Sequence, residues 1–387
     1  MIAVSSSTLR LAFSGMIGMA VAMGIGRFVF TPILPLMMEG LGLSPTDAGW
    51  IASANYLGYL VGAFAAAGAW GGQRERQLML AALASSAVLA AAMGLTNSLA
   101  IFLIVRFLAG VASAFVMVFL ASIVFSHLAA AGQTHLQSIH FAGVGVGIAA
   151  SSLMMAWLLS IQAPWQDAWF GAALLSVAGF CFVGLTIKSG PVQQAGDSSA
   201  EPPLPRDPAL VRLIIAYGLF GFGYIVTATF LVAIVRQGDG GRIFEAVVWL
   251  VTGLAIIPSI HLWGRLARTR GVISAYIIGC LVEAVGVAAS VSLGGRVGPI
   301  LSGLLLGGTF VAVTAYGLQA GRLLAPRSPR RALALMTAAF GVGQIIGPIV
   351  AGRLAYSTGS YLAPSLMAAF VLLVSAAFVW PDRHATS

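Results

Sequence analysis

Residues 188–208, KSGPVQQAGDSSAEPPLPRDP, divide this chain of 387 residues into two parts of similar length. The stretch is rich in proline, glycine, serine and charge, and a long series of apolar segments lies on either side of it. A composition of this kind is typical of a flexible connection and does not form a membrane-spanning helix. The stretch therefore predicts two halves joined by a polar linker.

The segments on either side of this stretch are too apolar for a water-soluble protein. Hydrophobic residues make up 59% of the chain and charged residues only 8%, against about 25% in soluble domains. The apolar runs are long enough to cross a bilayer and lack the alternation of barrel strands. We expect twelve helical spans, near 10–38, 45–70, 77–95, 98–126, 135–161, 165–187, 208–236, 244–267, 271–293, 297–324, 330–356 and 360–380. The prediction is an all-α polytopic membrane protein with two six-helix bundles (1–187 and 208–387) and a cytoplasmic linker (188–207).

The net charge of +9 is distributed as membrane orientation requires. With the N-terminus inside, the inner side would hold Arg10, Arg74, Arg76, Lys188, Arg206, Arg212, Arg265, Arg268, Arg270, Arg322, Arg327, Arg330, Arg331 and Arg383, and the outer side only Arg236, Arg242, Arg296 and Arg353. Cytoplasmic loops carry the excess of basic residues. We therefore expect a bacterial inner-membrane protein with both termini in the cytoplasm, and no nucleic-acid partner.

Short glycine-rich sequences recur at a nearly constant distance. GVGI begins at Gly145 and GVGQ at Gly341, an offset of 196, and GIGRF begins at Gly24 and GFGYI at Gly221, an offset of 197. Each pair joins a span of the first half with the corresponding span of the second half. A duplicated six-helix unit explains both offsets.

The chain resembles the major facilitator superfamily, and within it the YbfB/YjiJ family. The resemblance rests on GIGRFVFTPILPLM in the first span, AGWIASANYLGYLVGA in the second, YGLFGFGYIVTATFL in the seventh, GGTF in the tenth and GVGQIIGP in the eleventh. It implies transport by alternating access, with spans 1, 4, 7 and 10 around a central cavity. The loops GAWGGQRERQ and GRLARTRG lack the aspartate of the superfamily signature, and the fifth span lacks the proline associated with drug antiporters.

Arg27 is the first candidate for substrate binding. It lies in the apolar stretch VAMGIGRFVFTP, residues 21–32, near the middle of the first span. A charge at this depth costs about 2.5–3.5 kcal/mol on insertion scales, so its side chain must face protein or water. The resemblance places it at the substrate site, where a guanidinium can bind a carboxylate with two parallel hydrogen bonds. The alternative is a structural arginine that binds backbone carbonyl groups where Gly24 and Gly26 loosen the helix.

Polar and aromatic side chains of other spans complete the predicted site. Tyr224 occupies the position of Arg27 in the second half. The other candidates are Asn55, Tyr56, Tyr59, Tyr316, Gln319 and Gln344. Interhelical hydrogen bonding is the alternative role for each of them.

Three further residues are candidates for proton coupling or gating. Arg106, followed by Gly110, resembles the Arg-x-x-x-Gly motif of the superfamily, which is implicated in proton coupling; the alternative is an arginine that extends toward the outer headgroups. His140 has a suitable intrinsic pKa for a proton relay, although a lone histidine near a helix end is more often an interfacial or hydrogen-bonded residue. Glu283 is an acid deep within a span, where a bond to a neighbouring helix is the alternative.

The central parts of the other spans offer no acid, so we expect a positively charged cavity that fits anions. No enzyme motif, Walker loop or metal-ligand spacing occurs, and we expect neither a cofactor nor a metal. The prediction is a monomeric secondary transporter in the lipid bilayer for a small organic anion, a carboxylate, with proton symport carried by His140 or by the substrate. One alternative is a proton-driven exporter of amphipathic compounds or drugs that uses Arg106. The other is a receptor or scaffold on a transporter fold.

Overall fold

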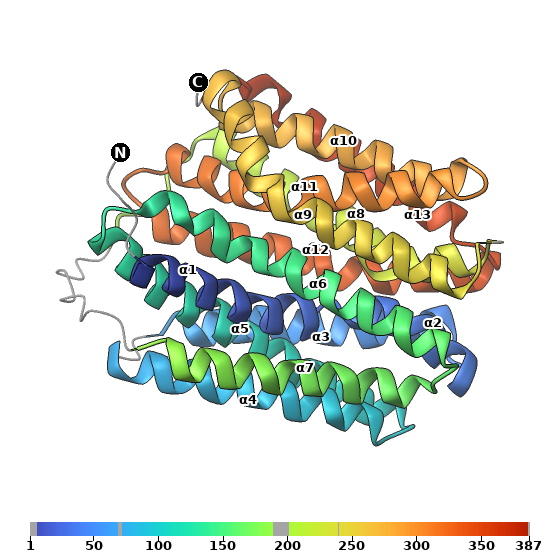
Figure 1. Cartoon of the computed structure of the whole chain (residues 1–387). Helices are drawn as coiled ribbons and strands as arrows, with labels where there is room; N and C mark the ends of the chain where they lie inside the picture. The colour runs from blue at the N-terminus through green and yellow to red at the C-terminus, as the bar shows by residue number, and fades with distance from the viewer. Residues whose placement is uncertain (1–5, 69–71, 189–200, 239, 386–387) are drawn as a thin grey trace.

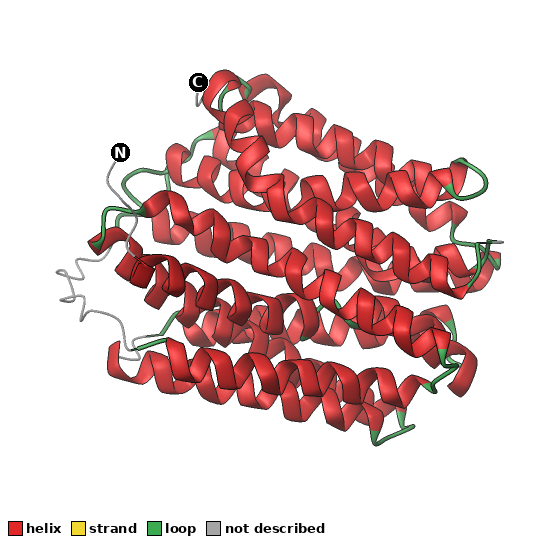
Figure 2. Cartoon of the chain, viewed as in Figure 1, coloured by secondary structure: helices red, strands yellow, loops and turns green. Residues whose placement is uncertain are grey.

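The computed structural model describes residues 6–68, 72–188, 201–238 and 240–385, and all regular structure in this part of the chain is helical (Figure 2). The helices of the first half are α1 (Ser6–Met19), the π-helix η1 (Ala20–Ile25), α2 (Phe30–Leu41), α3 (Pro45–Ala66), α4 (Gly72–Gly94), α5 (Leu99–Ala130), α6 (Gln137–Ser160) and α7 (Trp165–Thr186). Those of the second half are α8 (Pro208–Arg236), α9 (Arg242–Arg270), α10 (Val272–Ser292), α11 (Val297–Leu324), α12 (Pro329–Thr358) and α13 (Leu362–Val379). Short 3-10 turns occur at Thr134–Leu136 and Trp380–Asp382.

Each predicted span coincides with one helix, except that the first is divided into α1, η1 and α2. Eleven spans in the described residues are long and apolar enough to cross a membrane. Only α3 falls short of that measure, since glycine, serine, asparagine and tyrosine interrupt its apolar residues. Most of the predicted linker, 188–207, lies outside the described residues.

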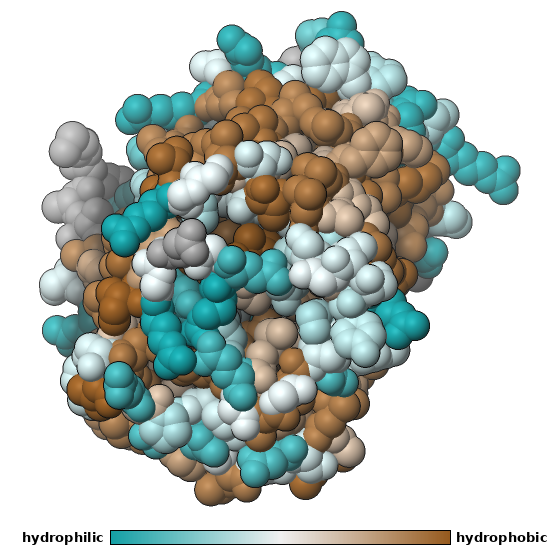
Figure 3. All heavy atoms as spheres, turned by 90° about the vertical axis from the view of Figure 1, so that its right-hand side faces the viewer, coloured by the Kyte–Doolittle hydropathy of each residue, from teal (hydrophilic) through white to brown (hydrophobic). Residues whose placement is uncertain are grey.

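The helices of the two halves form two adjacent blocks, with α1–α7 below and α8–α13 above in Figure 1. The described chain begins and ends at the same end of the molecule, which we call the terminal end. Figure 3 looks onto the opposite end, where polar side chains gather over the centre of the face and apolar side chains surround them. Exposed large side chains such as Leu174 and Phe370 are explained by contact with lipid.

Glycines bring helices of the two halves into backbone contact. A methyl group at Gly145 of α6 would lie 2.4 Å from the carbonyl oxygen of Gly253 on α9. A methyl group at Gly49 of α3 would lie 2.3 Å from the carbonyl oxygen of Pro348 on α12. Small residues allow such approach in membrane helices. Any larger side chain at these positions requires the halves to separate.

Candidate substrate-binding site

The break in the first span positions Arg27. Two hydrogen bonds of the π type, from the Gly26 amide to Val21 O (2.8 Å) and from the Phe28 amide to Met23 O (3.2 Å), precede the break. Pro32 has no N–H to donate to Phe28 O, and the Thr31 amide turns back to that oxygen at 3.2 Å instead. Arg27 therefore lies on irregular backbone between two helical segments, near mid-depth of the span.

Arg106 of α5 binds the carbonyl groups at this break. Its Nη1 donates to Gly26 O (3.1 Å) and its Nη2 to Arg27 O (3.0 Å), and only 1% of the residue is exposed. The guanidinium also lies over the ring of Phe30, 5.2 Å from its centre. The alternative of a side chain extending to the outer headgroups is therefore wrong. Arg106 instead holds the backbone on which Arg27 is carried.

The Arg27 guanidinium is buried among aromatic rings and lacks an acidic partner in the described chain. It lies over Tyr59, 4.1 Å from the ring centre, and over Tyr56 at 5.0 Å. Its Nη2 donates to Gln344 Oε1 on α12 at 2.8 Å, and Gln344 Nε2 donates to the Tyr224 hydroxyl on α8. The cation is thus held by one neutral hydrogen bond and by ring faces, and its Nε has no partner. Such an arrangement leaves a buried positive charge available for an anion.

A cavity of about 190 Å³ begins at Arg27 and runs between the halves. The first half contributes Met19, Met23, Arg27, Phe28, Tyr59, Met117, Phe141 and Val144; the second contributes Tyr217, Tyr224, Phe310, Val311, Thr314, Ala315, Leu318, Thr337 and Phe340. Phe28 and Tyr224, which lie beside Arg27, are buried, whereas Phe141, Leu318 and Thr337 near the terminal end are half-buried. The cavity therefore opens toward the terminal end.

Stacked rings form the wall of the cavity in the second half. The ring of Tyr224 is almost parallel to those of Phe310 and Phe340, and its centre lies 5.5 and 5.6 Å from theirs. Tyr217 also stacks on Phe340, with the ring centres 4.9 Å apart. This arrangement fixes the Tyr224 hydroxyl beside Gln344. The stacked rings make this wall largely apolar, and the Tyr224 hydroxyl lies at its charged end.

Beyond Arg27 the halves are in direct contact. The Thr31 hydroxyl donates to Ala228 O (2.6 Å), the hydroxyls of Tyr56 and Thr229 share a hydrogen bond (3.1 Å), and Ser53 donates to Ile345 O (2.7 Å). These bonds join α2 or α3 to α8 or α12. They close the cavity on the side away from the terminal end.

Three predicted binding residues lie elsewhere. Asn55 donates from Nδ2 to Arg106 O (3.0 Å) and joins α3 to α5. The Tyr316 hydroxyl donates to Ile260 O on α9 (3.1 Å), and Gln319 is exposed. We leave these three side chains out of the proposed site, which keeps Arg27, Tyr56, Tyr59, Tyr224 and Gln344.

His140 and Glu283 are both buried outside the cavity wall. His140 packs between Phe125 and Phe141, with ring centres 5.1 and 5.3 Å away, and neither ring nitrogen has a hydrogen-bond partner in the described residues. The alternative of an interfacial histidine is therefore wrong. Glu283 accepts a hydrogen bond from Thr309 of α11 at 3.1 Å, as expected for a bond to a neighbouring helix, and its other oxygen is unpartnered.

Because Arg106 holds the backbone of Arg27, a substitution of Arg106 is expected to weaken ligand binding although Arg106 does not contact the ligand. Arg106→Lys keeps the charge but leaves one of the two carbonyl groups unpaired, so the backbone that carries Arg27 relaxes. A bound anion must then restore its position, at a cost of about 1–3 kcal/mol. We expect about tenfold weaker binding, since 1.4 kcal/mol corresponds to a factor of ten. The measurement is ligand titration of the purified variant by calorimetry.

Arg76→Lys is the matched control for this substitution. Arg76 also donates to two carbonyl oxygens at a helix end, Ile187 O (2.7 Å) and Gly184 O (2.8 Å), but it does not line the cavity. This variant should bind as the parent does. Equal affinities of the parent and of both variants would contradict the role assigned to Arg106.

Comparison with known proteins agrees with the architecture. The family model described as "Uncharacterised MFS-type transporter YbfB" matches residues 19–380. A chloramphenicol resistance protein of Streptomyces lividans is 26% identical over 383 residues, which cover 92% of this chain and 93% of the relative. A crystal structure of the nucleoside transporter NupG, in a point-mutant form, shares the fold with a TM-score of 0.78 at 14% identity over 96% of this chain and 99% of that one.

A bacterial homologue of the human lysosomal transporter Spinster, in an inward-facing and occupied conformation, gives a TM-score of 0.72 at 12% identity, with 98% of this chain and 97% of the other covered. These two likenesses show the fold alone. The family match, in contrast, extends over nearly all spans, including the Arg27 segment and Gln344. The chain therefore belongs to the YbfB-like family of major facilitator transporters.

Proposed function

We propose that this transporter moves a small organic anion, a carboxylate with an apolar body, across a bacterial inner membrane by alternating access. The observation that carries the proposal is Arg27, a buried guanidinium without an acidic partner at the closed end of a central cavity. A carboxylate is the group that would complete its hydrogen bonds and its charge. With both termini in the cytoplasm, the cavity is open inward, and the terminal and opposite ends are the inner and outer ends.

The cavity walls define the rest of the substrate. Apart from Arg27, Thr314, Thr337 and the tyrosine hydroxyls, the lining side chains are aliphatic, aromatic or methionine. A volume of about 190 Å³ is smaller than the roughly 300–1,000 Å³ of sites for drug-sized ligands. A compact molecule with one carboxylate and a hydrophobic remainder fits these walls, whereas a polyhydroxylated sugar acid would leave most of its hydroxyl groups without partners.

Proton symport is the proposed coupling, with His140 or the carboxyl group of the substrate as the carrier. His140 is a buried imidazole without a hydrogen-bond partner in the described residues, and the next residue, Phe141, lines the cavity. Glu283 is a second candidate, since its partner Thr309 precedes Phe310 of the cavity wall. Accumulation of substrate in proteoliposomes under an imposed pH gradient tests the coupling and gives its direction.

The test of the function is a thermal-shift screen of the purified protein. The panel contains apolar monocarboxylates, sugar acids, phosphates, neutral sugars and cationic drugs. A ligand at a hundred times its Kd stabilises the native state by about 2.7 kcal/mol. We expect stabilisation by the apolar monocarboxylates. Stabilisation by the cationic drugs or the neutral sugars, with no response to any anion, would overturn the proposal.

The second candidate function is proton-driven export of amphipathic compounds. Two observations favour it: the similarity to a chloramphenicol resistance protein over most of the chain, and the apolar lining of the cavity. A drug-sized compound requires a cavity larger than the one in this conformation. Drug susceptibility of cells that lack or overproduce the protein separates the two functions.

A further inference from the structure

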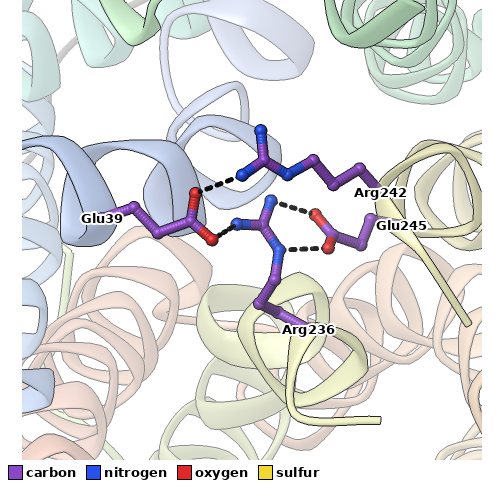
Figure 4. Close-up of polar contacts among 4 residues, drawn as sticks. All are labelled: Glu39, Arg236, Arg242 and Glu245. Atoms are coloured by element: carbon purple, nitrogen blue, oxygen red, sulfur yellow. Dashed lines mark hydrogen bonds and ion pairs between the residues drawn. The ribbon is translucent and has the colours of Figure 1, made fainter. Parts of the chain in front are cut away.

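Four charged side chains meet at the outer end, where α2 ends beside α8 and α9 (Figure 4). Arg236 donates from Nε and Nη2 to the two oxygens of Glu245, the second bond being 2.7 Å long. Its Nη1 donates to Glu39 Oε1, and Arg242 Nη2 donates to Glu39 Oε2 at 3.1 Å. Each carboxylate oxygen therefore has an arginine donor, and the cluster has no net charge.

The two carboxylates have different positions relative to the halves. Glu245, with 3% of its side chain exposed, belongs to the second half, as do both arginines. Glu39 comes from the first half, and 45% of its side chain is exposed. The bonds of Glu39 thus cross between the halves, whereas the bonds of Glu245 remain within one. Glu245 fixes the orientation of Arg236 whether or not Glu39 is bound.

Glu39 and Arg236 are equivalent positions of the internal repeat, separated by 197 residues. The same separation joins Thr31 to Ala228, which share a hydrogen bond, and Arg27 to Tyr224, which both bind Gln344. Helices α2 and α8 therefore lie against each other along an approximate two-fold axis, and residues near such an axis contact their own equivalents. Opposite charges at one equivalent pair convert that contact into an attraction between the halves.

We propose that Glu39, Arg236 and Arg242 form an outer latch that holds the outer end closed while the cavity is open inward, and that breaks when the outer end opens. Arg236 stays paired with Glu245 after the break, and the exposed Glu39 carboxylate becomes hydrated. The separated state therefore leaves no buried charge unpaired, which allows the bonds to break and form again in each cycle. The proposal rests on the transport cycle proposed above, but not on the identity of the substrate.

Ser53 provides a reporter for outer opening. It lies on α3 between the outer end and Tyr56, is 2% exposed, and donates to Ile345 O of the other half. The variant Ser53→Cys is made in a chain whose free cysteines, Cys181 and Cys280, are replaced by serine. A charged, membrane-impermeant methanethiosulfonate is added to the outside of right-side-out vesicles, without substrate. The rate of labelling measures the population with an open outer end.

Glu39→Gln removes the charge attraction between Glu39 and the two arginines of the other half. Glu245→Gln is its matched control, because it removes the other carboxylate from the same arginine. We expect Glu39→Gln to raise the labelling rate about tenfold, within the roughly 5- to 150-fold range of couplings between sites. Arg242→Gln, which removes one bond of the latch, should give a smaller increase, and Glu245→Gln should label no faster than the parent.

Two results would overturn the latch: labelling of Glu39→Gln at the parent rate, or an equal increase in Glu245→Gln. The melting temperature of each variant shows that the protein remains folded. The assay contains no substrate, so failure of the anion screen would leave its result unaffected. Conversely, a labelling result that overturns the latch would not affect the proposal of an anion site at Arg27.

Discussion

Arg27→Met is expected to abolish the response to anions while the melting temperature of the ligand-free protein stays at or above that of the parent. Arg27 is a buried cation without an acidic partner in the described chain, so a hydrophobic side chain removes the cost of burying a charge, which offsets the one hydrogen bond lost to Gln344. Breaking the pair with a bound carboxylate, in contrast, costs about 3–5 kcal/mol of binding free energy. The measurements are differential scanning calorimetry and ligand titration.

Arg106→Met is the control for the melting temperature of Arg27→Met, because it also removes a buried arginine. Both arginines are buried, but Arg106 satisfies two backbone carbonyl groups, and its loss leaves them unpaired at about 1–3 kcal/mol each. We therefore expect Arg106→Met to lower the melting temperature. If Arg27→Met melts as early as Arg106→Met, then Arg27 is a structural residue and the anion site is refuted. Arg27→Lys should bind with intermediate affinity, because it keeps the charge but loses the parallel hydrogen bonds.

Most of the fold could be predicted from the sequence because a bilayer imposes simple constraints. Each span must be apolar over about 20 residues, and this length predicted the positions of the twelve spans. Gly24 and Gly26 indicated that the first helix is loosened near Arg27, but not the form of the break. It depends on the π-type hydrogen bonds before Gly26 and on the donors of Arg106, which come from a helix about 80 residues further along the chain. Local sequence signals do not contain such a partner.

The candidate site could be predicted where a residue was unusual for its surroundings. A charge in an apolar span marked Arg27, and the repeat offset marked Tyr224, which indeed lies near it through Gln344. Helix rotation explains why Gln319 does not line the cavity: Leu318 does, but Gln319, about 100° further around α11, is exposed. The phenylalanines of the cavity wall were missed because aromatic residues are common throughout the chain.

The outer latch escaped the sequence analysis for a different reason. Charges at the ends of membrane spans are ordinary, so neither Glu39 nor Arg236 stands out from its surroundings. Only the repeat offset of 197 residues connects the two. Three features lie one after another along the axis between α2 and α8, from the middle of the molecule to the outer end: the anion site, the bond from Thr31 to Ala228, and the latch. Closure of the outer end and formation of the site thus involve the same pair of helices.

Gly49→Ala combined with Gly352→Ala is expected to open the outer end although the latch residues Glu39, Arg236 and Arg242 are unchanged. The added methyl groups would lie 2.3 Å from Pro348 O and 2.3 Å from Pro45 O, where α3 and α12 meet near that end. The obstacle in each case is backbone, so the two helices must separate before either methyl group fits. Labelling of Ser53→Cys from outside should therefore rise at least as much as in Glu39→Gln.

Gly308→Ala is the control for this prediction, because a methyl group there meets no atom within 4 Å. It should label at the parent rate. Steric separation by the glycine variants and electrostatic release by Glu39→Gln act through different helices, α3 with α12 and α2 with α8. If both raise the labelling rate, the inward-open state is held by closure of its outer end as a whole. A folded glycine double variant that labels at the parent rate would show that the contact between α3 and α12 is not part of that closure.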